Sequence, residues 1–516
     1  MEKSPPAVSS SSEESRDISL HNVLVAHGLG LAPDGSFVRW LEKNPRHPRN
    51  WSTPRKFYDL IVIHLCDFFV TVASSAGTAA AKAAHVEFGI SQTMAIFCFV
   101  SVSLMGQVLG SLILSSYSET FGRKRLYVLS TAIFSIGCII IPAVPSLAAV
   151  VIGRWVTGFV SSIPANVLTG SLEDMYNSQD RLWWMCMIAV ASNLGLVLGP
   201  LFGVYITTDL GWRWLFYIMA IITGILAGLC MFIRESRPAL VLAHEVALFR
   251  QTTGLDTPPP LNPDHSPDFR TFARTTLLRP IQLYTEPIVC CVALMNSTTF
   301  GLIYLFSDAL LPIYENMGFA QPQASLPFIA MAIGVILSLG MRLVDRVIIR
   351  RRINSGRTLL PEHKLTGLCV GTPMLAISLW WFGWTIPPRI QGLHWMVPTL
   401  PLVLLGFALN EFLTVMLGYL ADSYLCYAAS GLAAVALLRG VFSAVFPLFA
   451  GHMFSSLGAN VATSVLASLA TVYCFIPPLF VRYGPQIRAR SRFAKHSLRT
   501  HEATCIDKDQ FVTVAN

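Results

Sequence analysis

The chain has 516 residues, of which 53% are hydrophobic and only 13% are charged, and its mean hydropathy is +0.56. The charged fraction is about half that of an ordinary soluble domain. This composition excludes a soluble globular enzyme, a disordered protein and a secreted disulfide scaffold. The formal net charge of +8 indicates membrane orientation rather than nucleic-acid binding, because no basic stripe is interleaved with aromatic residues.

Twelve segments are apolar over about the 20 residues that a helix needs to cross roughly 30 Å of hydrocarbon. The sequence therefore predicts a multi-pass, all-α membrane protein with twelve transmembrane helices. The first 56 residues contain no apolar core preceded by a charged stretch, so we expect no cleaved signal peptide. The predicted spans are residues 57–80, 93–115, 126–145, 147–170, 182–206, 212–233, 287–312, 325–345, 366–386, 395–420, 428–450 and 460–481.

The distribution of Lys and Arg predicts the orientation of these spans. If the N-terminus is cytoplasmic and the sides alternate, 32 of the 37 Lys and Arg residues lie on the cytoplasmic side. Both tails and the long central loop are therefore predicted to be cytoplasmic. The remaining five residues are Lys82, Arg213 and Arg389 on outer loops, and Arg154 and Arg439 within spans.

The central loop divides the spans into two sets of six. This layout resembles the major facilitator superfamily, which implies two parallel six-helix repeats around a central site. The linker begins with an amphipathic stretch and continues as a proline-rich, polar segment that we expect to be flexible. The predicted units are a disordered N-tail (1–56), a first six-helix bundle (57–233), the linker (234–286), a second bundle (287–481) and a C-tail (482–516).

A weak internal repeat supports two related halves. The fourth span ends in Asp174-Met175-Tyr176, and the tenth ends in Asp422-Ser423-Tyr424. Two matching residues are also compatible with chance.

The short loop after the second span reads SETFGRKR, residues 118–125. Gly122 allows a tight turn, and Glu119 can pair with Arg123 or cap a neighbouring helix. The simplest interpretation is a cluster of positive charge that keeps the loop cytoplasmic. The spacing also resembles the facilitator loop G-x-L-x-D-R-x-G-R-[KR], although the leading Gly and the Asp are replaced here. That resemblance implies a conformational latch made by Glu119, Gly122, Arg123 and Lys124.

The fifth span contains a glycine stripe with a proline: Gly195, Gly199, Pro200 and Gly203. Small residues four apart let helix backbones approach closely, and a proline bends the helix. Close packing alone would explain the stripe. The pattern also resembles the antiporter signature G-x8-G-x3-G-P-x2-G-G, with its first and last Gly replaced, which implies proton-driven export through a kinked helix.

Three carboxylates are proton-coupling candidates: Asp67 near the middle of the first span, Glu411 in the tenth, and Asp308 near the outer end of the seventh. Shielding from water favours the neutral carboxyl, and a nearby Arg favours the charged one. A carboxyl group that alternates between these two environments would bind a proton in one and release it in the other. The competing interpretation is a permanently neutral or salt-bridged structural acid, and Asp308 is also compatible with a place at the membrane interface.

Arg154 in the fourth span is a fourth proton-coupling candidate. An arginine inside the membrane is costly and normally faces a cavity or a partner. The alternative is a structural arginine that snorkels or stacks on an aromatic ring. The surrounding residues resemble the facilitator R-x-x-x-G element, which implies a part in steering proton transfer. Arg439 in the eleventh span allows the same two interpretations.

No pattern in the sequence predicts an enzyme. The eleven Cys residues form no C-x-x-C pair, and the histidines lack a second metal ligand at helical spacing. We therefore expect no metal and no cofactor. There is no nucleophile with a histidine partner, and no nucleotide-binding domain that would support ATP-driven transport.

Longer motifs resemble fungal drug:proton antiporters with twelve spans. Residues 44–52 are similar to their opening N-P-x-N-W-S motif, residues 211–216 match G-W-R-W-x-F, and residues 234–238 are similar to the element that closes their sixth span. Further matches lie at residues 419–424, 428–430, 446–449 and 482–493.

This resemblance implies a monomeric plasma-membrane exporter of small organic molecules, either drugs or fungal secondary metabolites, that works by alternating access in exchange for protons. The partners would be the cargo, protons and the lipid bilayer, with no nucleic acid. A polyamine transporter is the alternative, and a non-transporting sensor on the same fold is a weaker one.

Overall fold

The computed structural model describes residues 23–31, 37–41, 44–176, 178–255, 257–260, 278–356, 360–390, 392–424, 428–491 and 493. Within these residues, twelve helical segments are long and apolar enough to cross a membrane. The predicted twelve-span, all-α membrane fold is therefore confirmed. Three of the spans, the first, eighth and twelfth, extend well beyond the bounds that hydropathy alone predicts, because each is built from two helices in succession.

The first six spans form one half of the molecule, which we call the N-half. Short π-helical turns interrupt its second and fourth spans, at Phe97–Ser101 and Ile163–Val167. The helices are α2 (Thr53–Ser75) with α3 (Gly77–Phe88), α4 (Gln92–Ile96) with α5 (Val102–Phe121), α6 (Arg123–Ala143), α7 (Leu147–Ser162) with α8 (Leu168–Met175), α9 (Ser178–Asp209) and α10 (Trp212–Cys230).

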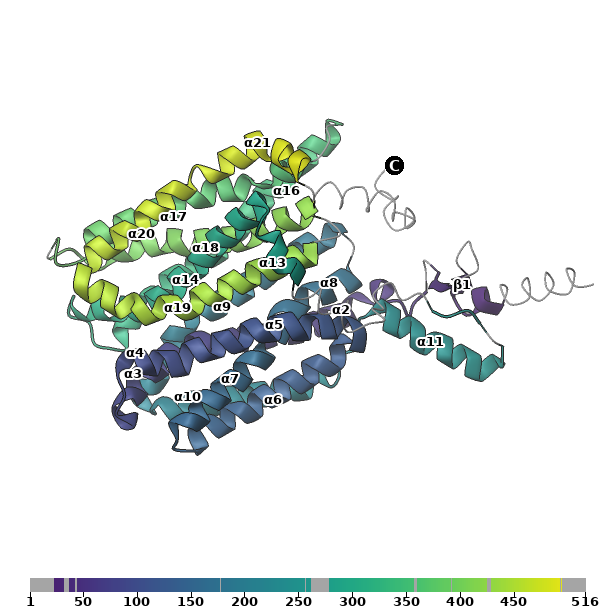
Figure 1. The fold of residues 1–516 in the computed structure, drawn as a ribbon, viewed down its shortest axis with the longest axis horizontal. Coiled ribbons are helices and arrows are strands. Elements are labelled where there is room, and N and C mark those ends of the chain that lie inside the picture. The colour runs from purple at the N-terminus through teal and green to yellow at the C-terminus, as the bar shows by residue number, and fades with distance from the viewer. Residues whose placement is uncertain are drawn as a thin grey trace, which may run out of the picture.

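The last six spans form the C-half, preceded by the short helix α13 (Arg279–Leu283). Its helices are α14 (Pro287–Glu315), α15 (Pro327–Leu337) with α16 (Leu339–Asn354), α17 (Thr366–Thr385), α18 (Met396–Tyr424), α19 (Ala428–Leu457), and α20 (Ala459–Tyr473) with α21 (Ile476–Arg490). The two halves meet where α5 packs along α19 (Figure 1). They also meet where α9 packs along α15.

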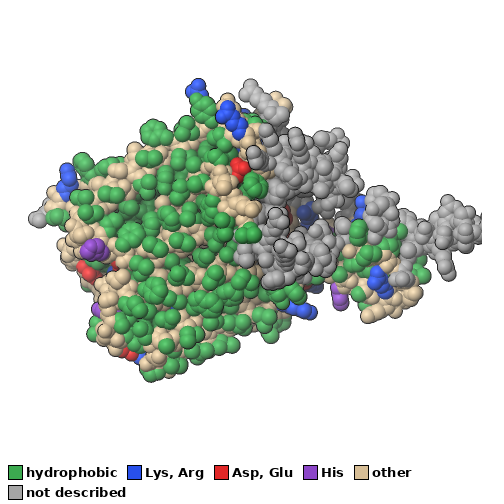
Figure 2. Space-filling model, viewed as in Figure 1, with side chains coloured by type: hydrophobic (Ala, Val, Ile, Leu, Met, Phe, Trp, Pro, Cys, Tyr) green, Lys and Arg blue, Asp and Glu red, His purple; other side chains and the backbone are tan. Residues whose placement is uncertain are grey.

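The outer surface of the bundle is apolar, whereas polar side chains lie inside. Figure 2 shows a broad hydrophobic face, with charged side chains gathered towards the two ends. Ile152, Ile225 and Val472 are among the large apolar residues that this arrangement exposes. Asp67, Asn193 and Glu411 are among the polar residues that it buries. This inverted pattern suits a protein whose solvent is the hydrocarbon of a bilayer.

The N-tail and the start of the linker fold together at one end of the bundle. Strands β1 (Leu29–Leu31) and β2 (Val38–Trp40) form an antiparallel hairpin, which packs on helix α11 (Pro238–Thr253). A small apolar core holds them together, made of Leu24, Leu29, Val38, Leu242, Val246 and Phe249. We call this unit the tail module. Its end of the bundle is the tail face, and the end that carries α3 and α4 is the far face (Figure 1).

Polar contacts tie the N-tail to α11 as well. Trp40 Nε1 donates a hydrogen bond to the backbone oxygen of Pro238 at 3.3 Å, and Arg46 forms an ion pair with Glu245. Part of the segment for which sequence predicts disorder therefore has ordered elements in the structure. The proline-rich part of the linker that we expect to be flexible lies largely outside the described residues.

Candidate transport site and tail-face latch

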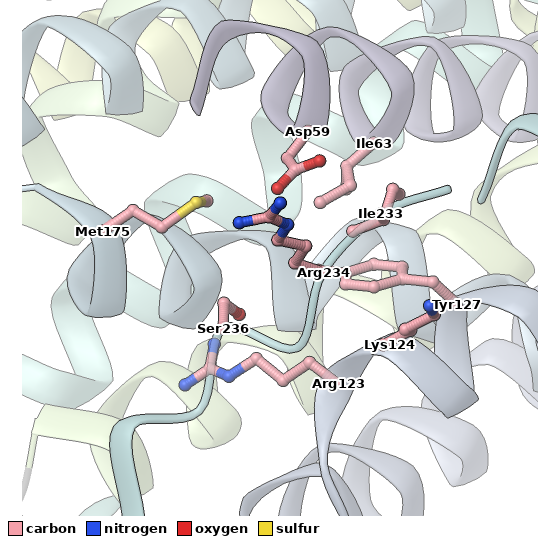
Figure 3. A pocket seen from close by; sticks show the side chains of 9 residues that line it. All are labelled: Asp59, Ile63, Arg123, Lys124, Tyr127, Met175, Ile233, Arg234 and Ser236. Carbon is pink, nitrogen blue, oxygen red and sulfur yellow. The ribbon is translucent and has the colours of Figure 1, made fainter. Parts of the chain in front are cut away.

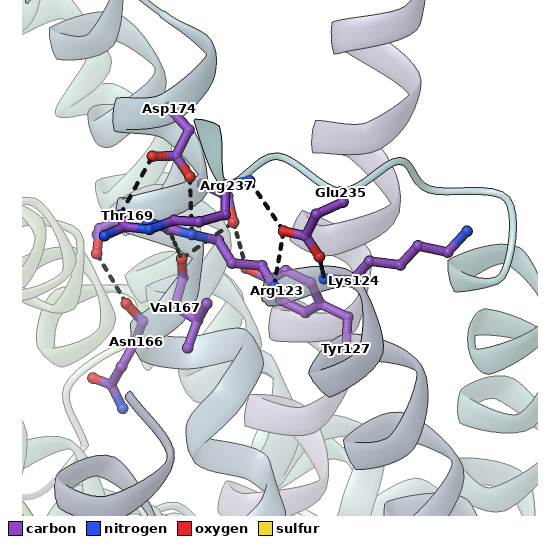
Figure 4. Close-up of polar contacts among 10 residues, drawn as sticks. Arg123, Lys124, Tyr127, Asn166, Val167, Thr169, Asp174, Glu235 and Arg237 are labelled. Atoms are coloured by element: carbon purple, nitrogen blue, oxygen red, sulfur yellow. Dashed lines mark hydrogen bonds and ion pairs between the residues drawn. The ribbon is translucent and has the colours of Figure 1, made fainter. Parts of the chain in front are cut away.

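Arg123 is the centre of a buried ion-pair cluster at the tail face. Its Nε lies 2.9 Å from Asp174 Oδ2, and its guanidinium also donates to the backbone oxygen of Val167 at 3.1 Å. The chain reaches this position through Gly122, whose φ of +96° is strained for any residue with a side chain. Figure 4 shows the side chain of Arg123 pointing into this cluster and that of Lys124 pointing away from it.

Glu235 caps the start of α6. Its carboxylate accepts hydrogen bonds from the backbone N–H groups of Arg123 and Lys124, each at 3.0 Å, and from that of Arg237 at 3.0 Å. A carboxylate at a helix N-terminus satisfies free amides and interacts favourably with the helix dipole. Figure 4 shows Glu235 approaching from the segment after α10. It thereby joins the sixth span to the third.

These contacts add two residues to the predicted latch. The sequence offers Glu119 as the partner of Arg123 or as a helix cap, and in the structure Asp174 also pairs with Arg123 and Glu235 caps α6. The side chain of Glu119 lies outside the described residues. Both added residues carry a signal in the sequence, because Asp174 belongs to the internal repeat and Glu235 to one of the family-like motifs.

The C-half has a related pair at the same face. Asp422, the repeat counterpart of Asp174, lies 2.5 Å from Lys364 Nζ. Next to it, Arg488 pairs with the buried Glu362, with Nη2 2.8 Å from Oε1. In both halves, therefore, an ion pair fixes the end of a span that lies at the tail face.

A narrow pocket lies beside the latch, within the N-half. Figure 3 shows Asp59 and Arg234 directed towards one another inside it, with Tyr127 and Met175 among its walls. Asp59 is buried and also lies 3.3 Å from Arg55. The pocket is lined by one half only, so it is not the central site that the layout of two repeats implies.

Asp67 lies in the interior of the membrane region, on α2. Its side chain is only 1% exposed, and Ser192 of α9 donates a hydrogen bond to its carboxylate. Helix α9, which carries Ser192, packs along α15 of the C-half. Asp67 is therefore a buried acid near the meeting of the two halves, and it does not face lipid.

A chain of polar side chains crosses from one half to the other near this point. Asn193 Nδ2 donates to Asn410 Oδ1 at 3.0 Å, and Asn410 Nδ2 donates to Ser338 Oγ at 2.7 Å. The hydroxyls of Ser74 and Tyr304 lie 3.1 Å apart. Sequence analysis did not single out Asn193 or the serines, because isolated polar residues in apolar spans show no distinctive spacing.

Glu411 follows Asn410 on α18 and is fully buried. Arg342 of α16 donates a hydrogen bond to its carboxylate and lies 2.9 Å from Asp345 Oδ2. The other carboxylate oxygen of Glu411 has no hydrogen-bond partner among the described residues. Arg342 falls within the predicted eighth span (325–345), and the structure extends this span to Arg352.

Asp308 joins the two halves at the far face. Its Oδ1 lies 2.9 Å from Lys82 Nζ, and Lys82 also donates to its backbone oxygen at 2.8 Å. Lys82 belongs to α3 rather than to the outer loop that the sequence predicts. The arrangement is an ion pair between the first and seventh spans.

Arg154 is almost fully buried, at 1% exposure. It donates to the backbone oxygens of Phe99 at 2.6 Å and Ala73 at 3.3 Å, and it lies 5.6 Å from the ring centre of Phe216. These contacts match the structural interpretation of an aromatic-stacked arginine. A part in proton steering stays a prediction.

The glycine stripe of α9 packs against α2 and α3 inside the N-half. A Cβ atom on Gly195 or Gly199 would lie 2.6 or 2.7 Å from a backbone oxygen of α2, and one on Gly203 would crowd α3. Pro200 lies within α9. The stripe therefore brings α9 close to the helix that carries Asp67.

Comparison with known proteins identifies the family. The family model described as Major Facilitator Superfamily matches residues 63–447. The chain is 31% identical over 456 residues to "Multidrug transporter TPO1_2" of Candida glabrata, covering 87% of this chain and 78% of that protein. It is 32% identical to "Efflux pump FUB11" of Gibberella moniliformis, covering 85% and 74%.

Solved structures show the same fold at low identity. The proton:xylose symporter XylE has a TM-score of 0.59 at 14% identity, with 84% of this chain and 97% of that chain covered. The human organic anion transporter MFSD10 has a TM-score of 0.56 at 16% identity, with 83% and 100% covered. The chain is thus a membrane transporter rather than an enzyme, and it belongs to the Major Facilitator Superfamily.

Proposed function

We propose that the protein exports small organic molecules in exchange for protons, by alternating access, with Asp67 and Glu411 as the groups that carry the protons. The protein would act as a monomer in the plasma membrane, with both termini in the cytoplasm. The names of its relatives support export, since one is called an efflux pump and another a multidrug transporter.

The observation that carries the proposal is the pairing of two buried acids with different partners. Asp67 accepts from a neutral hydroxyl of Ser192, whereas Glu411 accepts from the cation Arg342. A shielded carboxyl next to a hydroxyl can hold a proton, and one next to a guanidinium can release it. A movement that exchanges such environments would couple proton uptake and release to the opening of each side.

Contacts at the two faces support two separate gates. Lys82 and Asp308 connect the halves at the far face. Towards the tail face, an apolar cluster joins them, with Cys186 and Val190 of α9 against Val335 of α15. Alternating access requires that these two contacts break at different times. The Arg123–Asp174 latch would hold the N-half as a unit while they do so.

A polyamine transporter needs uncompensated acids in its central site, since its cargo carries several positive charges. Here Arg342 balances the charge of Glu411 in an ion pair, and Asp67 contacts the neutral hydroxyl of Ser192. This arrangement favours neutral or acidic cargo over polyamines.

The test uses purified protein in liposomes with an imposed pH gradient and two labelled cargoes, an azole drug and spermidine. We expect gradient-driven azole uptake by the unaltered protein, and loss of the gradient dependence in Asp67→Asn and Glu411→Gln. Glu87→Gln is the matched control, because Glu87 forms an exposed pair with Arg213 at the far face. Unchanged gradient-driven transport in both acid variants would overturn the proton sites, and spermidine as the preferred cargo would favour the polyamine alternative.

A further inference from the structure

Arg439 differs from the other arginines deep in the membrane region. Arg154 donates to two backbone oxygens, and Arg342 pairs with Glu411 and Asp345. Within the part of the chain that the structure describes, the guanidinium of Arg439 has neither a hydrogen bond nor an ion pair, and its closest described contact is the Phe300 ring, 4.7 Å away.

The side chain of Arg439 lies between the halves rather than against lipid. It faces the ring of Phe300, one turn before Tyr304 on α14, and Tyr304 in turn contacts Ser74 of the N-half. The next residue, Gly440, packs closely against Val108 of α5. Arg439 is nevertheless only half-buried.

Aromatic residues lie beside Arg439 on the side of the C-half. Phe300 precedes Gly301, and the absence of a side chain at Gly301 leaves room for the ring of Phe446. Phe442 and Phe446 follow Arg439 on α19 at helical spacing, with ring centres 5.2 Å apart. The cation therefore lies beside an apolar, aromatic wall, which is the usual composition of a small-molecule site.

An unpaired cation inside the membrane is costly, and such residues mark ligand pathways. A guanidinium donates two parallel hydrogen bonds to a carboxylate, can donate to the single oxygen of a carboxamide, and stacks on aromatic rings. It also repels an ammonium group. We propose that Arg439 determines the charge selectivity of the transport site: it binds an oxygen-bearing end of an aromatic cargo, carboxylate or carboxamide, and excludes cationic cargo. This inference rests on the proposed export of organic molecules and names their chemical class.

The test measures binding of three naphthalene compounds of similar shape to the purified full-length protein: 2-naphthoate, 2-naphthamide and 2-naphthylmethylamine. We expect the unaltered protein to bind the acid and the amide more tightly than the amine by roughly tenfold or more, which corresponds to about 1.4 kcal/mol. Arg439→Gln should remove this preference, and Arg439→Lys should keep the discrimination against the amine while binding the acid and the amide more weakly.

Arg213→Gln is the control for loss of an arginine, since Arg213 lies in an exposed pair at the far face. Equal selectivity in the unaltered protein and in folded Arg439→Gln, judged by gel filtration and thermal unfolding, would overturn the inference. Failure of this inference is distinguishable from failure of the proposed function. Proton-driven transport lost in Asp67→Asn and Glu411→Gln with unchanged selectivity in Arg439→Gln would reject only the role of Arg439, and the opposite pattern would reject only the proton sites.

Discussion

Lys82 of α3 and Asp308 of α14 form an ion pair between the two halves at the far face, with Nζ 2.9 Å from Oδ1. Asp308 is buried and Lys82 is partly exposed. The pair is therefore positioned to hold the far side of the transporter closed. Removing one partner of a buried, hydrogen-bonded charge pair costs about 2–5 kcal/mol, which is enough to shift an equilibrium between closed and open states.

Asp308→Asn should consequently populate the state that is open at the far face. The measurement is the distance between spin labels placed on α3 and on α14, recorded for the purified protein. We expect a longer distance in the variant and no change in Glu87→Gln, whose carboxylate contacts α10 of the same half. An unaltered distance distribution in Asp308→Asn would show that the pair does not hold this side closed.

Asp174→Asn should destabilise the tail-face latch, because it leaves Arg123 buried without its carboxylate partner. Loss of one partner of a buried ion pair costs about 3–5 kcal/mol, so thermal unfolding should begin at a lower temperature and transport should slow. Asp422→Asn provides the comparison, since the Lys364–Asp422 pair is partly exposed and surface pairs contribute only about 0–1 kcal/mol. Equal effects of the two variants would contradict the importance assigned to Arg123.

Gly199→Ala should disturb the packing of α9 against α2. The added Cβ would lie 2.7 Å from a backbone oxygen of α2, and overpacking of this kind costs about 1–3 kcal/mol. Thermal unfolding and transport rate are the measurements. Gly228→Ala is the control, because a Cβ at Gly228 meets no atom within 4 Å. If both alanine variants behave alike, close approach at Gly199 is not required.

His47 should make the N-tail sensitive to acid. Burial, with the nearby charges of Arg49 and Lys56, lowers the pKa of His47 from 6.5 to about 4. The folded segment therefore binds fewer protons than the unfolded one between these values. Its stability is fully present above pH 6.5 and is lost as the pH falls towards 4.

Hydrogen exchange of residues 44–52 between pH 7 and pH 4.5, corrected for the intrinsic rate, measures this effect. Protection should decrease over this range in the unaltered protein, and the decrease should be smaller in His47→Gln. The imidazole Nδ1 accepts a hydrogen bond from the backbone N–H of Arg49, and the amide oxygen of Gln can replace it without titrating. Constant protection over this range in the unaltered protein would refute the prediction.

The membrane spans could be predicted from sequence because hydropathy over about 20 residues reports directly on transfer into hydrocarbon. Burial of Asp67 and Glu411 followed from their place in such spans, but their partners could not be predicted. Arg342 lies within the predicted eighth span, yet no local pattern marks it as the partner of Glu411. Lys82, the partner of Asp308, lies beyond the predicted first span and was assigned to a loop, although α3 includes it.

Contacts between segments far apart in the chain could not be predicted from the sequence either. Glu235 caps a helix that starts 112 residues earlier, and Trp40 contacts the linker 198 residues later. No local pattern encodes such pairings, since each depends on how complete helices pack. The hairpin of the tail module was missed for the same reason, because its strands have three residues each and are completed by α11.

The central claim is that Asp67 and Glu411 exchange protons as cargo moves. The most direct measurement records the pH inside cargo-loaded liposomes that contain the protein, using a trapped pH-sensitive dye. The account predicts proton entry when cargo is allowed to leave, and no cargo-dependent proton movement in the Asp67→Asn, Glu411→Gln double variant. Cargo efflux without any proton entry in the unaltered protein, or the same proton entry in the double variant, would contradict it.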